Sequence, residues 1–346
     1  REIFFVVRPR EPSAPLLLTI ATNTYAAYNN VGGKCFYDYI STDREHTDLV
    51  SFRRPLQSEM LGTFYAWDQF FTSWLDAEAY EVDYATNADH DAEPDLLASY
   101  KANLRIGHDE YNTRGECEQL QQFVSAGGNL ILFAGNCFFH EVSYRNEFTQ
   151  LHCYQPQYQV SPTPDRPETR MWAFIEQMRQ RTIGVMYTSF VHAKTETRGK
   201  FLAPVTEDGK YGHYRVTEPG HWIFAGTGLR EGDEFGREDS IVGIELDAAD
   251  MTFVDGKPEL TGVDGVSKHY RVLALADAVI YDDRFMRLDG SGSGAMADAY
   301  GVVAINETEF KGTVFNAATI EWGHGLYRDN SPVAQITRNV LNRLGR

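Results

Sequence analysis

Short apolar runs and stretches of helical spacing alternate along the first 135 residues of the chain. The apolar runs predict buried strands at residues 14–23, 81–87, 103–107 and 129–135. Apolar positions at helical spacing predict a helix at residues 64–80. Pro94 begins a short predicted helix at residues 94–100, and a third helix is predicted at residues 113–127. Because strands that alternate with helices form parallel sheets, we expect an α/β fold with a doubly wound, mostly parallel sheet.

Polar residues at the predicted helix ends support these boundaries. Thr113 and Glu116 form a T-x-x-E capping box, and Gly127 stands where the helix that they begin should end. Ser331 begins a closing helix over residues 333–344, whose apolar positions form one stripe.

The middle of the chain departs from this alternation. It contains proline-rich and glycine-rich pieces (SPTPDRPE, EDGKYGHY, GTGLREGDEFG) and one helical patch at residues 169–181. Strand-like stretches return in YRVLALADAVIY, YGVVAINET and GTVFNAATIEW. We therefore expect a single α/β domain over residues 1–346, with an irregular or β-rich insertion at residues 155–239.

Charge and composition narrow the classes of function. A formal net charge of −17 argues against nucleic acid as a partner, because such binders gather Lys and Arg on one face. No run reaches the roughly 18 apolar residues of a membrane span, and REIFFVVRPREP is interrupted too early for a signal peptide. The four cysteines are too widely spaced for a zinc ribbon or a dense disulfide framework, which indicates a reducing, cytoplasmic setting.

Polar and aromatic side chains follow three of the predicted strands, at residues 23–28, at residues 108–111 and at Asn136. Ligands of open parallel sheets bind outside the carboxyl ends of the strands, so these side chains should meet at one edge. The helix that contains Tyr65 begins at the same edge. The sequence therefore predicts one site built from separate loops.

Tyrosines beside a glutamate indicate a hard, highly charged cation. A phenol titrates near pH ~10 and ionises at neutral pH only beside strong positive charge. Two phenolates and one carboxylate carry three negative charges, which match ferric iron.

Four stretches, in the order TNTYAAYNNVGGKCFYDY, WLDAEAYEVDYATN, GHDEYNTRGECEQLQQFVSAGGNLILFAGN and GIELD, resemble the catalytic domain of the N,N-dimethylformamidase large-subunit family. The resemblance runs over nearly the whole chain. It implies a core of the class I glutamine-amidotransferase type and an amidohydrolase with a mononuclear Fe³⁺ site of two tyrosines and one glutamate. It also implies a small amide substrate, a small accessory subunit and a homo-oligomer.

Carried over residue by residue, the resemblance makes Glu110 and Tyr28 metal ligands. The second phenolate is not fixed by it. Tyr65 suits the expected helix position, Tyr37 is an alternative, and a residue upstream of residue 1 is another.

The same resemblance implies that His108 and Asn136 line the pocket and that Glu245, in GIELD, is a catalytic carboxylate. Glu245 would carry a proton from water to the departing amine, because a basic amine leaves only after its nitrogen is protonated. His108 and Asn136 would donate hydrogen bonds to the oxyanion.

Other interpretations of these residues remain open at this point. Glu110 could cap the helix that begins near Thr113, and Asn136 could merely supply a left-handed turn. A cysteine amidohydrolase would use Cys137 as nucleophile and His324 as base, although the bulky neighbours of Cys137 do not suit a nucleophile elbow. A non-catalytic sugar-binding or ligand-binding domain would use the aromatic residues of the crevice.

Overall fold

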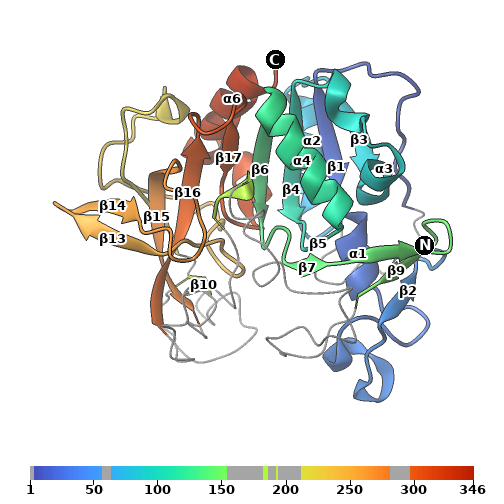
Figure 1. The fold of residues 1–346 in the computed structure, drawn as a ribbon. Coiled ribbons are helices and arrows are strands. Elements are labelled where there is room, and N and C mark those ends of the chain that lie inside the picture. Colours follow the sequence, from blue (N-terminus) through green and yellow to red (C-terminus); the bar gives the residue numbers. More distant parts are fainter. Residues whose placement is uncertain (1–3, 57–63, 154–181, 186–191, 194–211, 281–296) are drawn as a thin grey trace.

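The computed structural model describes residues 4–56, 64–153, 182–185, 192–193, 212–280 and 297–346. A ten-stranded sheet runs through them in the order β12-β11-β15-β16-β17-β6-β4-β1-β3, and β10 also pairs with β15 (Figure 1). The parallel pairs join β1 (Leu16–Ile20), β3 (Val82–Thr86), β4 (Ala102–His108), β6 (Asn129–Gly135) and β17 (Val314–Asn316). The antiparallel part comprises β10 (His192–Ala193), β11 (Tyr214–Val216), β12 (Glu234–Phe235), β15 (Arg271–Ile280) and β16 (Ala297–Asn306).

The predicted fold class is therefore wrong. A doubly wound, mostly parallel sheet of the class I glutamine-amidotransferase type would continue its parallel pairing beyond β17, but β16 pairs with β17 antiparallel. Of the nine pairs that join the described strands of this sheet, four are parallel and five are antiparallel. The error has a physical reason, because a continuous apolar run indicates a buried strand and carries no information about its direction.

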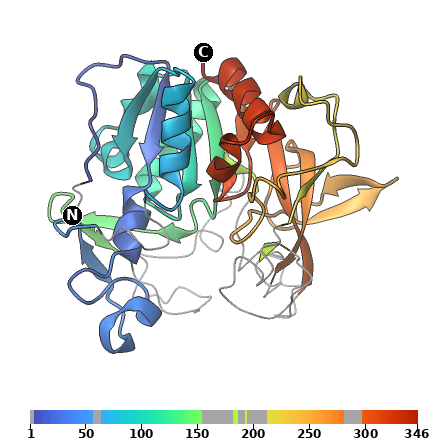
Figure 2. The same cartoon turned by 180° about the vertical axis from the view of Figure 1, so that it is seen from behind.

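Helices cover both faces of the parallel part of the sheet. Figure 2 shows α2 (Asp68–Ala77) and α6 (Pro332–Leu344) on one face, and Figure 1 shows α4 (Arg114–Ala126) on the other. Neighbouring residues of β1 divide between the two faces, as expected for a strand. Leu16 and Leu18 pack in the cluster with α2 and α6, whereas Leu17 packs in the cluster with α4.

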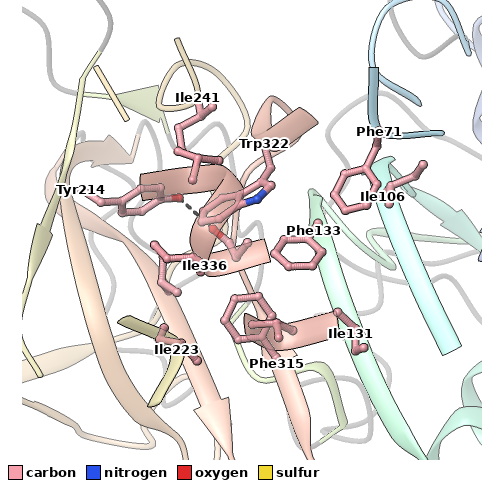
Figure 3. Close-up of a cluster of buried hydrophobic side chains, with 14 of the residues drawn as sticks. Phe71, Ile106, Ile131, Phe133, Tyr214, Ile223, Ile241, Phe315, Trp322 and Ile336 are labelled. Carbon is pink, nitrogen blue, oxygen red and sulfur yellow. Dashed lines mark hydrogen bonds between the residues drawn. The ribbon is translucent and has the colours of Figure 1, made fainter. Parts of the chain in front are cut away.

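The larger core cluster joins the two parts of the sheet. Phe133 of β6 stacks near Phe71 of α2, Phe315 of β17 and Trp322, with ring centroids 5.2–5.4 Å apart (Figure 3). Tyr214 of β11 reaches the same cluster and donates its hydroxyl to the carbonyl of Ala317 at 2.9 Å. Burial of these large aromatic groups stabilises the junction between the parallel and antiparallel strands.

The strand and helix predictions of the first half are confirmed in outline. The 129–135 strand is β6 without any shift, and the strands predicted at residues 14–23, 81–87 and 103–107 are β1, β3 and β4. Thr113 caps α4 by accepting the backbone N–H of Glu116 at 3.1 Å, and Gly127 adopts the left-handed conformation after it. The helix predicted at residues 94–100 is only the 3₁₀ turn η3 (Leu96–Ser99), and the pattern missed α3 (Asn87–Ala92).

Small elements cluster beyond the carboxyl ends of β1, β4 and β6, where Figure 1 shows α1, β5 and β7. They comprise α1 (Thr22–Tyr28), η1 (Asp38–Ile40), η2 (Thr42–Arg44), β5 (Tyr111–Asn112), β7 (His140–Glu141) and the sheet of β2 (Leu49–Ser51), β8 (Ser143–Arg145) and β9 (Gln150–His152). The hairpin of β13 (Met251–Val254) and β14 (Lys257–Leu260) projects beside β15, and the turns η5 (Trp222–Phe224) and η7 (Trp322–Leu326) complete the fold.

Most of the predicted insertion at residues 155–239 lies outside the described residues, as does the helical patch at 169–181. Within that range, β10, β11 and β12 are strands of the large sheet. The single-domain organisation stays a prediction. Across the part of the chain that is described, no helix has the length and apolar character needed to cross a bilayer.

Candidate functional site

A cluster of oxygen atoms surrounds the carboxylate of Glu110, which follows β4. The Tyr28 hydroxyl lies 2.8 Å from Oε2 of Glu110, and the Tyr37 hydroxyl lies 2.9 Å from Oε1 and 3.1 Å from Oε2. The two hydroxyls are 2.8 Å apart, and Tyr111 donates to the Tyr37 hydroxyl at 2.6 Å. Tyr28 and Tyr37 stack with their ring centroids 4.3 Å apart. Two phenols therefore share one buried carboxylate, and a third joins them through the Tyr37 hydroxyl.

Backbone hydrogen bonds hold Glu110 in this position. Its N–H donates to the Thr24 hydroxyl at 3.0 Å, and its carbonyl accepts the N–H groups of Phe139 and His140 at 2.9 Å. The helix-capping role is taken by Thr113 instead. The Glu110 side chain is thus free of the capping role and faces the tyrosines.

A second group lies directly beside the first and is centred on His108. The Nε2 atom of His108 is 2.9 Å from Oε2 of Glu245 and 3.3 Å from Oε2 of Glu110. The side-chain amide of Asn136 lies 3.3 Å from the same nitrogen. His108 and Asn136 are buried, and the Glu245 side chain keeps 19% of its surface exposed. The structure therefore brings together His108, Asn136, Glu245, Glu110 and Tyr28.

Burial and charge set the protonation of these groups in the absence of a cation. Burial and the Glu110 carboxylate raise the pKa of Tyr28 and Tyr37 well above the usual range of a phenol. Burial opposes a charge on His108, but Glu245 and Glu110 outweigh it and raise the pKa of His108 to about 10. Burial also opposes ionisation of Glu110, yet its hydrogen bond with His108 holds the pKa of that carboxyl below its usual value. Without a cation, the pocket thus favours neutral phenols beside an imidazolium and the Glu110 carboxylate.

The donor set decides which metal could bind here. Among the described residues, no three His, Cys, Asp or Glu side chains gather in a way that could hold a metal ion. A metal at this edge would need phenol oxygens, and Tyr28, Tyr37 and Glu110 offer such oxygens within 3.1 Å of one another. Anionic oxygen donors suit hard cations, so this set fits a trivalent ion.

The sequence left the second tyrosine open between Tyr65 and Tyr37. The structure places Tyr37, the alternative, against Tyr28 and Glu110. The ring of Tyr65 packs edge-to-face on Phe64, and its carbonyl accepts a hydrogen bond from Gln69. Tyr37 is therefore the tyrosine that completes the oxygen cluster with Tyr28 and Glu110.

The residues of the cysteine alternative lie in different surroundings. Cys137 is fully buried in the hydrophobic cluster that contains Phe138. The imidazole of His324 packs against the rings of Phe70 and Trp67 and lies 3.2 Å from the carbonyl of Ala66. A thiol buried in apolar surroundings is a poor nucleophile, because burial disfavours the thiolate.

Sequence comparison identifies the family of the chain. The family model described as N,N-dimethylformamidase beta subunit-like, C-terminal, matches residues 1–334. The chain belongs to this family.

A curated relative, the N,N-dimethylformamidase beta subunit of Alcaligenes sp., is 24% identical to this dimethylformamidase-like chain over 393 aligned residues. The alignment takes in 98% of the chain and 50% of the relative, so the chain spans about half the length of that protein. The solved structures that resemble the chain include β-galactosidases from Rahnella sp. R3 and from Bacillus circulans sp. alkalophilus. Their TM-scores are 0.43 and 0.42, their identities 12% and 11%, and each match covers 96% of this chain and 32% or 31% of the other.

A buried ionic network supports the site of this dimethylformamidase-like chain from beneath. Arg105 of β4 is fully buried and lies 2.6 Å from Asp109 and 2.7 Å from Glu116. Asp109 is the residue before Glu110, and Asn87 and Asn112 donate to its second oxygen at 3.3 and 3.0 Å. The network therefore fixes the loop that presents Glu110.

Two more residues complete the site of this dimethylformamidase-like chain: Tyr111, which falls in the predicted stretch 108–111, and His140, which the sequence did not indicate. Tyr111 joins the phenol cluster through Tyr37, and its ring stacks on His140 with centroids 5.0 Å apart. His140 in turn lies 3.6 Å from Oε1 of Glu110. The parallel pairing of β5 with β7 brings them together, and neither two-residue strand leaves a pattern in the sequence.

Proposed function

We propose that this chain is the catalytic domain of an iron-dependent amidohydrolase that cleaves a small N-substituted amide, similar to N,N-dimethylformamide, into a carboxylate and an amine. The observation that carries the proposal is the shared carboxylate of Glu110. It contacts the hydroxyls of two tyrosines and the imidazole of His108. His108 in turn contacts Glu245. Membership of the dimethylformamidase-like family and the name of the Alcaligenes relative support amide hydrolysis.

Tyr28, Tyr37 and Glu110 would hold the iron, because two phenolates and a carboxylate balance three positive charges. Tyr65 stays an alternative to Tyr37 from the sequence alone. When bound, ferric iron supplies Lewis acidity, which polarises an amide carbonyl or lowers the pKa of a water molecule.

Glu245 would be the acid/base group. Its carboxylate contacts His108 at 2.9 Å and keeps part of its surface open, so a water molecule can reach it. Hydrolysis adds the oxygen of water to the carbonyl carbon and breaks the C–N bond. Glu245 would accept the proton from water and pass it to the amide nitrogen, which then leaves as a neutral amine. His108, charged through its contacts with both carboxylates, would hold Glu245 in place during this transfer.

Asn136 would bind the substrate carbonyl. Nε2 of His108 carries one proton at most, and when it donates to Glu245 it cannot also accept from the Asn136 amide. The opposite orientation of the amide directs Oδ1 toward His108. The NH₂ group then takes the present place of Oδ1, a buried atom that has no hydrogen-bond partner within the described part of the chain. That NH₂ group would then be available to the oxygen of the substrate, an interaction worth about 3–4 kcal/mol in transition states of acyl transfer.

The resemblance extends the proposal to the assembly. The Alcaligenes relative is named a beta subunit, which supports a multi-subunit enzyme. We expect a small accessory subunit and a homo-oligomer for this chain as well, and a cytoplasmic location.

The proposal is tested by colour and metal content together. Tyrosinate bound to ferric iron absorbs visible light, so purified protein should be tinted and contain about one iron per chain. Tyr28→Phe and Glu110→Ala should bleach the colour and abolish hydrolysis of short N-alkyl formamides. Tyr100→Phe, which removes a buried hydroxyl that donates to Asp83 near the amino end of β3, is the matched control and should keep both. Colourless, iron-free protein that still hydrolyses formamides would refute the proposal.

A further inference from the structure

Two residues of the site adopt a backbone conformation that side chains normally avoid. Asn136 has φ 48° and Glu245 has φ 54°, both in the left-handed region. Such a conformation is unfavourable for most residues with a side chain, less so for Asn than for Glu, and contacts with the surroundings hold it in place. Contacts around these two residues must therefore supply that stabilisation.

Asp247 provides the contact that holds Asn136. The Asp247 side chain is fully buried, and its Oδ1 accepts the backbone N–H of Asn136 at 2.8 Å. A hydrogen bond from an amide to a carboxylate is stronger than one between neutral groups. It fixes the backbone from which the Asn136 side chain faces His108.

The segment that carries Asp247 is itself fixed on the large sheet. The N–H of Asp247 donates to the carbonyl of Ala318 at 2.9 Å, and its carbonyl accepts from Val302 at 3.0 Å. Leu246 pairs with Thr319 as an antiparallel bridge. Asp247 thus has a position set by the backbone of the strands around it.

The same segment presents Glu245. Its carbonyl lies against Gly135, the last residue of β6, where a Cβ atom would come within 2.7 Å of that oxygen. The segment therefore passes directly over the end of β6 before it reaches Asp247. One short stretch of chain contributes the acid/base carboxylate and also holds the residue that would bind the substrate carbonyl.

We propose that Asp247 is a positioning residue. Its effect on catalysis rests on the proposed amide hydrolysis. Its carboxylate sets the distance between the Asn136 amide and the Glu245 carboxylate, both of which face His108. Asp247 acts through the backbone of Asn136.

The test compares Asp247→Ala, which removes the acceptor, with Asp247→Asn, which keeps a side-chain oxygen in the same place. In Asp247→Ala we expect kcat to fall about tenfold or more while KM stays within about threefold, because misplacement acts on the transition state. Asp247→Asn should restore most of kcat. In protein labelled with ¹⁵N-asparagine, the Asn136 amide should lose its downfield shift and its exchange protection in Asp247→Ala and keep both in Asp247→Asn.

Asp83→Ala is the matched control. Asp83 is also buried and also accepts backbone N–H groups, those of Ser13 and Ala14 at 2.7 and 3.3 Å, but it lies near the amino end of β3. It should lower the melting temperature and leave kcat unchanged. If Asp247→Ala does not fold, Asp247→Cys makes the same comparison with a side chain of similar size that accepts poorly.

An Asn136 amide that is unchanged in Asp247→Ala would overturn the inference, as would a kcat that falls no further than in Asp83→Ala. If the wild-type chain hydrolyses no amide, the proposed function fails. The amide signal then decides the positioning role by itself, because it does not depend on turnover.

Discussion

Replacing Arg105 by methionine should destabilise the protein and loosen the loop that carries Glu110. Methionine has a similar length and no charge, so the change leaves Asp109 and Glu116 buried without their cation. It also leaves Asn103 without the donor that Nε of Arg105 supplies at 2.7 Å. Because all of these groups are buried, water cannot replace the lost contacts.

The magnitude follows from the burial of the two carboxylates. Breaking a buried ion pair by removing one partner costs about 3–5 kcal/mol. The entropy of unfolding at about 2.1 cal/mol/K per residue is roughly 0.7 kcal/mol/K for a chain of this length, so the melting temperature should fall by about 4–7 °C. Adding Glu116→Gln to Arg105→Met should recover part of this loss, because one uncompensated charge disappears.

Thermal unfolding followed by circular dichroism and by tryptophan fluorescence measures this prediction. Arg338→Met is the control, since Arg338 pairs with Glu78 at the surface and should cost no more than about 1 kcal/mol. Hydrolysis per folded molecule should also fall in Arg105→Met, because Asp109 directly precedes Glu110. Equal melting temperatures for Arg105→Met and the control would refute the reasoning, as would a second substitution at Glu116 that only destabilises further.

Three further predictions concern single residues. Gly107→Ala should lower the free energy of unfolding by more than the roughly 1–2 kcal/mol that a left-handed backbone (φ 63°) costs an alanine. The further loss arises because the added Cβ would overlap the Asp68 carboxylate. Chemical denaturation measures this free energy. Burial and Arg105 lower the pKa of His90 to about 3, so the folded state keeps this histidine neutral and loses stability as the pH falls from about 6.5 toward 3. The melting temperature of His90→Gln should therefore decline less steeply than that of the wild type over this range. Cys137→Ala should keep its hydrolysis per folded molecule, and an inactive variant that retains its iron would favour a thiol nucleophile instead.

The sequence predicted the parallel half of the sheet well and the antiparallel half poorly. Residues 129–135 match β6 because capping residues and glycines mark both of its boundaries. The strands β15 and β16 were recognised as strands, yet their direction depends on pairing between residues far apart, such as Ala274 with Val303. Local periodicity contains no information about such pairing.

The site shows the same division between local and distant information. Glu110, His108 and Asn136 could be predicted because each follows a recognisable strand, and the carboxyl ends of parallel strands share an edge. Tyr37 lies in an irregular loop just before η1, where no periodicity fixes its position. The two interpretations of Asn136 also prove compatible, since it adopts the left-handed conformation and faces His108 at the same time.

The charge balance at the sheet edge gives an independent argument for a bound cation. Arg105 and His108 contact four carboxylates, those of Asp109, Glu116, Glu110 and Glu245, which leaves an excess of two negative charges. His140, 3.6 Å from Glu110, removes at most one of them. Buried charge of one sign is costly unless protons or a cation neutralise it. The three phenols beside Glu110 cannot neutralise it, because a phenol adds negative charge when it ionises and none when it does not. The hydroxyls of Tyr28 and Tyr37 stabilise the Glu110 carboxylate by hydrogen bonding and leave its charge in place, which is the balance that the proposed hard cation requires.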